Sequence, residues 1–120
     1  MKQFDHDKLD VYQTAVQWVA LAQDIVDGML SGKGHAPLAD QLNRAASCIT
    51  LNIAEGAGEF APAEKSRFYW IAKRSATECA AALDVAQRRR CVSAQHLDQG
   101  RTLLFRIVGM LVKLAQAHTS

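Results

Sequence analysis

The sequence predicts an all-α fold, an antiparallel up-down-up-down four-helix bundle in which residues 1–120 form a single domain. Apolar residues recur at helical spacing in four segments, and glycine or proline marks the first two breaks between them. No segment alternates apolar and polar residues as a half-buried strand does. Short connections make successive helices antiparallel neighbours. A chain of 120 residues is also long enough to bury a core without disulfides or zinc.

The first helix is expected over about residues 7–29, where two adjoining apolar stripes form a wide apolar face. The stripes contain Leu9, Tyr12, Val16, Val19 and Val26, and beside them Ala15, Trp18, Ala22 and Ile25. Gly32 and Gly34 then supply backbone angles that a helix interior does not use. Pro37 suits the first turn of a second helix over about residues 37–55, because its missing N–H would have no helical partner there.

The second break is expected at residues 56–62, which contain two glycines and a proline. Glu64 follows in the first turn of a third helix over about residues 63–89, where a carboxylate meets the positive end of the helix. The third connection is short. Ser93 is the expected N-cap of a fourth helix over about residues 94–117.

Composition argues against a membrane protein, a metalloprotein and an enzyme. No apolar run approaches the roughly 20 residues needed to cross a bilayer, and the acidic N-terminus is unlike a secretory signal, so a cytoplasmic location is expected. The histidines are isolated, and no cysteine pair has the spacing of a metal site. We therefore expect no cofactor, no metal and no catalytic residues. The three cysteines are expected to be buried free thiols: Cys48, Cys79 and Cys91.

Charge is divided unevenly along the chain. Residues 1–60 carry four basic and eight acidic side chains, a net charge of −4, whereas residues 61–120 carry ten basic and four acidic ones, a net charge of +6. Several basic residues of the third and fourth helices follow heptad spacing, which is typical of a row that lies along phosphates. The predicted nucleic-acid-binding residues are Arg67, Arg74, Arg88, Arg89, Arg90, Arg106 and Lys113. An ordinary solvated helix face with some ion pairs is the alternative.

Sequence-specific readout of bases is not expected, because no helix-turn-helix, zinc-finger or RNA-recognition motif is present. Tyr69 and Trp70 lie next to these arginines and could stack on exposed bases. Packing in the core or in an interface is the favoured role for both, and for Trp18, because aromatic side chains in helices usually bury their area.

Two segments carry too few charges for helices of a monomeric bundle. Residues 45–54 have none, and residues 102–112 have only Arg106. This pattern predicts that extra helix faces are buried in contacts between copies of the chain, so a homo-oligomer is expected. The alternative is a partly exposed surface of small residues.

A polar stripe follows the second helix. Gln41, Arg44, Asn52 and Glu55 fall within a narrow sector, and the antiparallel return of the chain is expected to bring Glu78 to them. We call these five residues the polar seam and predict that it is buried or half-buried, with the guanidinium near two carboxylates. Such a group would fix helix register. A hydrolase that uses Glu55 or Glu78 as general acid or base is an unfavoured alternative.

The middle third of the chain resembles a known family. Gln41 and residues 44–47, followed by residues 52–56, match the central motif of the proteins encoded in 23S ribosomal RNA intervening sequences, which are similar to accessory proteins of diversity-generating retroelements. The motif continues along the third helix in Glu64, Arg67, Phe68, Ala72, Ser75 and Glu78. Two positions depart from the family pattern, since Asn43 stands where arginine is common and Arg74 where glycine is usual.

The resemblance implies a ring-shaped homopentamer of four-helix bundles that associates with nucleic acid and with a reverse transcriptase. Together with the basic residues, it favours a non-enzymatic, cytoplasmic homo-oligomer that binds structured RNA or DNA electrostatically. The alternative is a protein-interaction scaffold that recruits a protein partner such as a reverse transcriptase. No membrane partner is expected.

Overall fold

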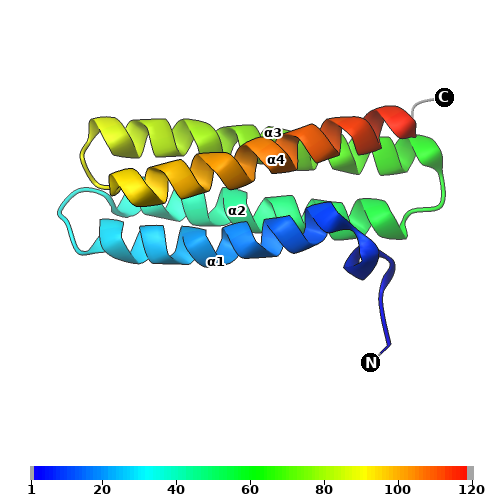
Figure 1. The fold of residues 1–120 in the computed structure, drawn as a ribbon, viewed down its shortest axis with the longest axis horizontal. Helices are drawn as coiled ribbons and strands as arrows, with labels where there is room; N and C mark the ends of the chain where they lie inside the picture. Colours follow the sequence, from blue (N-terminus) through cyan, green and yellow to red (C-terminus); the bar gives the residue numbers. More distant parts are fainter. Residues whose placement is uncertain (1, 119–120) are drawn as a thin grey trace.

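The computed structural model describes residues 2–118, which contain four long α-helices and no β-strand. The helices are α1 (Asp10–Leu30), α2 (Ala36–Gly58), α3 (Pro62–Arg88) and α4 (Ala94–Ala117), preceded by a 3-10 turn, η1 (Asp5–Lys8). Figure 1 shows the four helices side by side with alternating direction. Each helix contacts the next along the chain, and α4 closes the bundle against α1.

The first helix begins at Asp10 rather than at residue 7, because the chain makes a separate turn first. The Asp7 carboxylate accepts a hydrogen bond from the Phe4 N–H at 2.8 Å, and Leu9 then adopts an extended backbone that separates η1 from α1. The His6 ring lies between Phe4 and Tyr12, with ring centroids 5.6 and 4.4 Å away. These contacts hold the N-terminal turn against the bundle, where η1 also touches α2.

Helix α2 continues through Gly56 to Gly58, so residue 56 is not the start of a break. Gly56 is buried, and a Cβ atom placed on it would lie 2.8 Å from Cε1 of Tyr69 and 3.1 Å from Cβ of Phe68. The missing side chain therefore lets α3 approach α2 closely. Lys65 of α3 caps this helix end, because its Nζ donates to the carbonyl oxygens of Gly56 at 3.2 Å and Ala57 at 2.8 Å.

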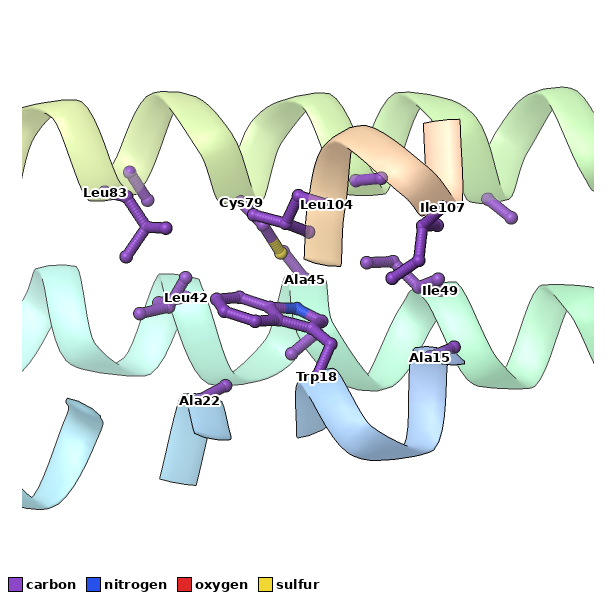
Figure 2. Close-up of a cluster of buried hydrophobic side chains, with 14 of the residues drawn as sticks. Ala15, Trp18, Ala22, Leu42, Ala45, Ile49, Cys79, Leu83, Leu104 and Ile107 are labelled. Carbon is purple, nitrogen blue, oxygen red and sulfur yellow. The ribbon is translucent and has the colours of Figure 1, made fainter. Parts of the chain in front are cut away.

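The core is centred on Trp18, whose side chain is fully buried between all four helices (Figure 2). Gly100 of α4 makes room for the indole, since a Cβ there would lie 3.1 Å from Cζ3 of Trp18. The indole Nε1 has no hydrogen-bond partner of good geometry among the described residues. The Cys79 side chain lies in the same core cluster, where burial raises the pKa of its thiol and an interaction with Trp18 opposes this rise.

Candidate nucleic-acid interface

Three consecutive arginines lie where α3 ends. Arg88 is the last residue of the helix, Arg89 is its C-cap, and Arg90 takes a left-handed backbone with φ of 59°. The N–H of Cys91 returns to the carbonyl of Ala86 at 3.0 Å, which makes a helix-ending motif in which glycine usually occupies the position of Arg90. This turn directs three exposed side chains into solvent at the negative end of a helix, where cations are favoured.

The arginine cluster, Arg88–Arg90, has no acidic partner within the part of the chain that the structure describes. None of the three side chains makes an ion pair or a side-chain hydrogen bond to residues 2–118. A shallow depression of about 510 Å³ lies beside the cluster, lined by Asp84, Val85 and Gln87 as well as by Arg88 and Arg89. The guanidinium groups are therefore free to meet an external anion.

The other predicted basic residues differ in whether a carboxylate of the same chain already pairs with them. Arg67 pairs with Glu64 at 3.0 Å and covers the ring of Phe68 at 4.6 Å, and the hydrogen bond to Glu64 raises its pKa. Its guanidinium therefore already has a carboxylate partner within the chain. Arg74, Arg106 and Lys113 are exposed and make no ion pair with residues 2–118. Arg106 and Lys113 are seven residues apart on α4, a separation of about 10 Å along the helix.

Arg101 is a basic residue that the sequence did not single out. It forms an ion pair with Asp84 at 2.6 Å, which links α4 to α3 near the arginine cluster. Asp84 is one of only four acidic residues in residues 61–120, and because it pairs with Arg101 it is not paired with the arginine cluster. Only the pairing of α3 with α4 could have revealed it, because the two residues are 17 positions apart.

Four residues of the polar seam are exposed and only Asn52 is half-buried, so the prediction of a buried or half-buried seam is wrong for the other four within the described chain. The side chain of Arg44 is 74% exposed and pairs with Asp40, one turn earlier on the same helix, at 3.2 Å. Gln41 and Glu78 do meet, since the Gln41 Nε2 donates to the carboxylate at 3.3 Å. Asn52 donates to the Cys48 carbonyl instead of joining them.

The two carboxylates of the seam are also far from each other. Glu78 lies beside Gln41, whereas Glu55 is 14 residues further along α2, or about 20 Å at the usual helical rise. Glu55 is exposed and lies near Arg67, whose pKa it helps to raise. An acid and base pair that acts on one bond requires much closer groups, so this arrangement does not support the hydrolase alternative.

The aromatic residues of α3 and α4 differ in how far they are exposed to solvent. Tyr69 is buried in the core, as the sequence favoured, whereas Trp70 is 37% exposed. The most accessible aromatic side chain of a helix is Phe105 on α4, at 83%, which the sequence did not single out. A signal was present, since Leu104, Ile107 and Leu111 define the core face of α4 and Phe105 falls outside it.

The expectation about cysteines holds only in part. Cys79 is buried and Cys91 is half-buried, but Cys48 is exposed on α2. Within residues 2–118 no group of three histidine, cysteine or acidic side chains has a geometry that could hold a metal ion. None of the described helices is long and apolar enough to cross a membrane.

These features define a small four-helix-bundle protein whose candidate functional groups, the unpaired arginines and the exposed Phe105, lie on its surface. The family model of the 23S rRNA-intervening sequence proteins matches residues 7–113. The chain belongs to this family, as the motif on α2 and α3 predicted. No curated protein matches it. The likeness to retroelement accessory proteins remains a prediction.

Proposed function

We propose that this protein is a non-enzymatic homo-oligomer, a pentamer by family resemblance, that binds RNA or DNA electrostatically through basic residues of α3 and α4. The observation that carries the proposal is the arginine cluster, three adjacent exposed guanidinium groups without an acidic partner in the described chain. Arginine pairs with phosphate through two parallel hydrogen bonds, which suits a nucleic-acid backbone. Arg74, Arg106 and Lys113 are the further candidates.

Oligomerisation would strengthen this binding. A single cluster can neutralise only about three phosphates, which gives weak and salt-sensitive binding. Several clusters held in one assembly raise the effective concentration at each successive contact and convert weak sites into useful avidity. The cluster offers charge and no base-reading element, so discrimination between sequences should be small. The family's description refers to 23S rRNA, and a ribosomal RNA hairpin is therefore the first ligand to test.

The test is fluorescence anisotropy of a labelled ribosomal RNA hairpin, titrated with protein at several salt concentrations. The variant changes Arg88, Arg89 and Arg90 to Gln. Its control changes Lys2, Lys8 and Lys33 to Gln, which removes the same charge from other exposed positions. We expect the arginine variant to bind more weakly and its logarithmic salt slope to fall by about 2 to 3 per engaged subunit, while the control keeps the wild-type slope.

Two results would overturn the proposal. Equal losses in the two variants would show that only net charge matters and that the cluster is not the binding site. No binding by the wild-type protein at low salt would exclude nucleic acid as the ligand and would direct the search to a protein partner, such as a reverse transcriptase.

A further inference from the structure

The arginine cluster is divided between two depressions at one end of the bundle. Arg88 and Arg89 line the depression of about 510 Å³ described above, whereas Arg90 lines a second depression of about 430 Å³. The second one lies where the last two turns of α1, the turn after α3 and the first turn of α4 come together (Figure 1). We call it the Arg90 pocket. Its lining includes Asp24, Ile25, Arg90, Val92, Ser93 and His96.

The Arg90 pocket differs from its neighbour because it contains a free carboxylate. Asp84 of the other depression is paired with Arg101, but Asp24 makes no ion pair and no side-chain hydrogen bond with residues 2–118. Asp24 and Arg90 therefore line one cavity without pairing with each other. A single ligand can satisfy both if it brings a hydrogen-bond donor to the carboxylate and an anion to the guanidinium.

The other groups of the Arg90 pocket are of the kinds that hold a sugar. Ile25 is buried and Val92 is half-buried, so they give the pocket an apolar wall. The hydroxyl oxygen of Ser93 accepts a hydrogen bond from the His96 N–H at 3.0 Å, and its own hydrogen can still be donated to a ligand. The half-buried imidazole of His96 adds a further polar group. An apolar wall with a few polar groups is typical of a small-molecule subsite.

A nucleotide of RNA presents the required donor and anion next to each other. Its phosphate is the anion, and its ribose 2′-hydroxyl is a hydrogen-bond donor that DNA lacks. The bases are a less suitable source of donors, because those of a duplex are paired, whereas the 2′-hydroxyls and phosphates stay accessible. Among the described residues that line either depression there is no phenylalanine, tyrosine or tryptophan on which an unpaired base could stack.

We infer that the Arg90 pocket binds one ribose-phosphate unit of an RNA chain, with Arg90 on the phosphate and Asp24 accepting a hydrogen bond from the 2′-hydroxyl. The inference rests on the proposed function and names its ligand as RNA in preference to DNA. The carboxylate of Asp24 repels the phosphates of any nucleic acid, but in RNA the hydrogen bond from the hydroxyl compensates for this repulsion. Arg88 and Arg89 then meet neighbouring phosphates from the other depression.

The test compares two labelled ribosomal RNA hairpins of the same sequence by fluorescence anisotropy. One carries ordinary ribose, and the other carries 2′-fluoro sugars at every position, which keep the A-form geometry but cannot donate a hydrogen bond. The wild-type protein should bind the ordinary hairpin about 3- to 10-fold more tightly, which is the usual effect of one exposed hydrogen bond. We call the ratio of the two dissociation constants the hydroxyl preference.

The first pair of variants separates the hydroxyl from the charge. Asp24→Ala and Asp27→Ala each remove one carboxylate from an exposed position of α1, but Asp27 does not line the Arg90 pocket and instead accepts a hydrogen bond from Gln23. Both variants should bind the 2′-fluoro hairpin more tightly, because the protein becomes more positive. Only Asp24→Ala should lose the hydroxyl preference.

The second pair of variants separates the two depressions. Arg88→Gln and Arg90→Gln each remove one exposed guanidinium, so both should weaken the binding of both hairpins. Arg90→Gln should also reduce the hydroxyl preference, because the ribose is no longer held against Asp24. Arg88→Gln should keep the preference. Circular dichroism checks that all four variants fold like the wild-type protein.

The failures of this inference and of the proposed function are distinguishable. No binding of either hairpin by the wild-type protein at low salt would contradict the proposed function itself. Equal binding of both hairpins would leave the proposed function intact and overturn this inference, as would a hydroxyl preference that persists in Asp24→Ala. Displacement of the RNA hairpin by an equimolar amount of adenosine monophosphate would also overturn it, because the pocket would then belong to a free nucleotide.

Discussion

Gly56 gives the sharpest prediction, because the structure explains why this position of the family motif has no side chain. A Cβ at residue 56 would lie 2.8 Å from Cε1 of Tyr69 and 3.1 Å from Cβ of Phe68. The Tyr69 ring is buried, and the Phe68 Cβ is fixed to the backbone of α3, so neither can simply turn away. A Gly56→Ala protein must separate the two helices locally.

The magnitude follows from two opposing effects. Overpacking of a filled core typically costs about 1 to 3 kcal/mol. Alanine favours the helix over glycine by up to about 1 kcal/mol, and by less near a helix end. We therefore expect Gly56→Ala to lower the free energy of unfolding by about 1 to 2 kcal/mol. For a domain of this size, each kcal/mol lowers the melting temperature by roughly 3 to 6 °C.

Gly28 provides the matched control. It also lies two residues before the end of its helix, but it is exposed, and a Cβ atom placed on it would have no neighbouring atom within 4 Å. Gly28→Ala should raise the free energy of unfolding by up to about 1 kcal/mol. Urea unfolding followed by circular dichroism at one chain concentration measures both. Equal changes in the two variants, or a stabilised Gly56→Ala protein, would refute the packing argument.

Two further predictions follow from burial. Arg44→Ala should change the free energy of unfolding by less than about 0.5 kcal/mol, because the pair with Asp40 is exposed; urea titration measures this, and a loss of several kcal/mol would show that the guanidinium is desolvated in an assembly. Burial raises the pKa of the Cys79 thiol from 9.0 to about 12. As the pH rises, the Cys79 thiol therefore loses its proton in the unfolded chain before it does so in the folded protein. Below pH 9 the free energy of unfolding is unaffected by this group. Above pH 9 it declines by up to about 1.4 kcal/mol per pH unit, until the folded thiol also ionises. Unfolding at pH 8 to 11 should show a steeper decline for the wild-type protein than for Cys79→Ala, and parallel curves would contradict the assignment.

The helices could be predicted from the sequence because their signals are local. Apolar residues at helical spacing define α1 to α4, and Pro37 and Pro62 each lie in the first turn of a helix. The end of α2 could not be predicted in this way. A glycine that supplies a special backbone angle and a glycine that admits a neighbouring helix look identical in sequence. The difference at Gly56 depends on Tyr69 and Lys65, which belong to another helix.

The polar seam shows a different limit. Spacing fixes the directions of Gln41, Arg44 and Glu55 relative to one another, but burial depends on their direction relative to the core. Leu42, Ile49 and Ile53 mark the core face of α2. At 100° per residue, Arg44 points about 160° away from Leu42, so its exposure was implied by the sequence. The ion pair with Asp40 was equally local, whereas the bond from Gln41 to Glu78 required the pairing of α2 with α3.

The arginine cluster and Phe105 together explain why the surface function was harder to predict than the fold. Exposed charge is normal on any helix, so the seven basic residues that the sequence singled out looked equivalent. The structure separates them by their surroundings: Arg67 pairs with Glu64, and the arginine cluster has no acidic partner within residues 2–118. Arg74 lies one turn after the exposed Trp70 on α3, and Arg106 directly follows the exposed Phe105 on α4. A free charge beside exposed apolar area suits a protein neighbour, because burial of the apolar area supplies the affinity and the charge supplies the orientation. A free charge without such area suits a polyanion, whose attraction is almost entirely electrostatic. The two kinds of surface on this chain are therefore expected to differ in their response to salt, with the copy-to-copy contact retained at concentrations that release nucleic acid.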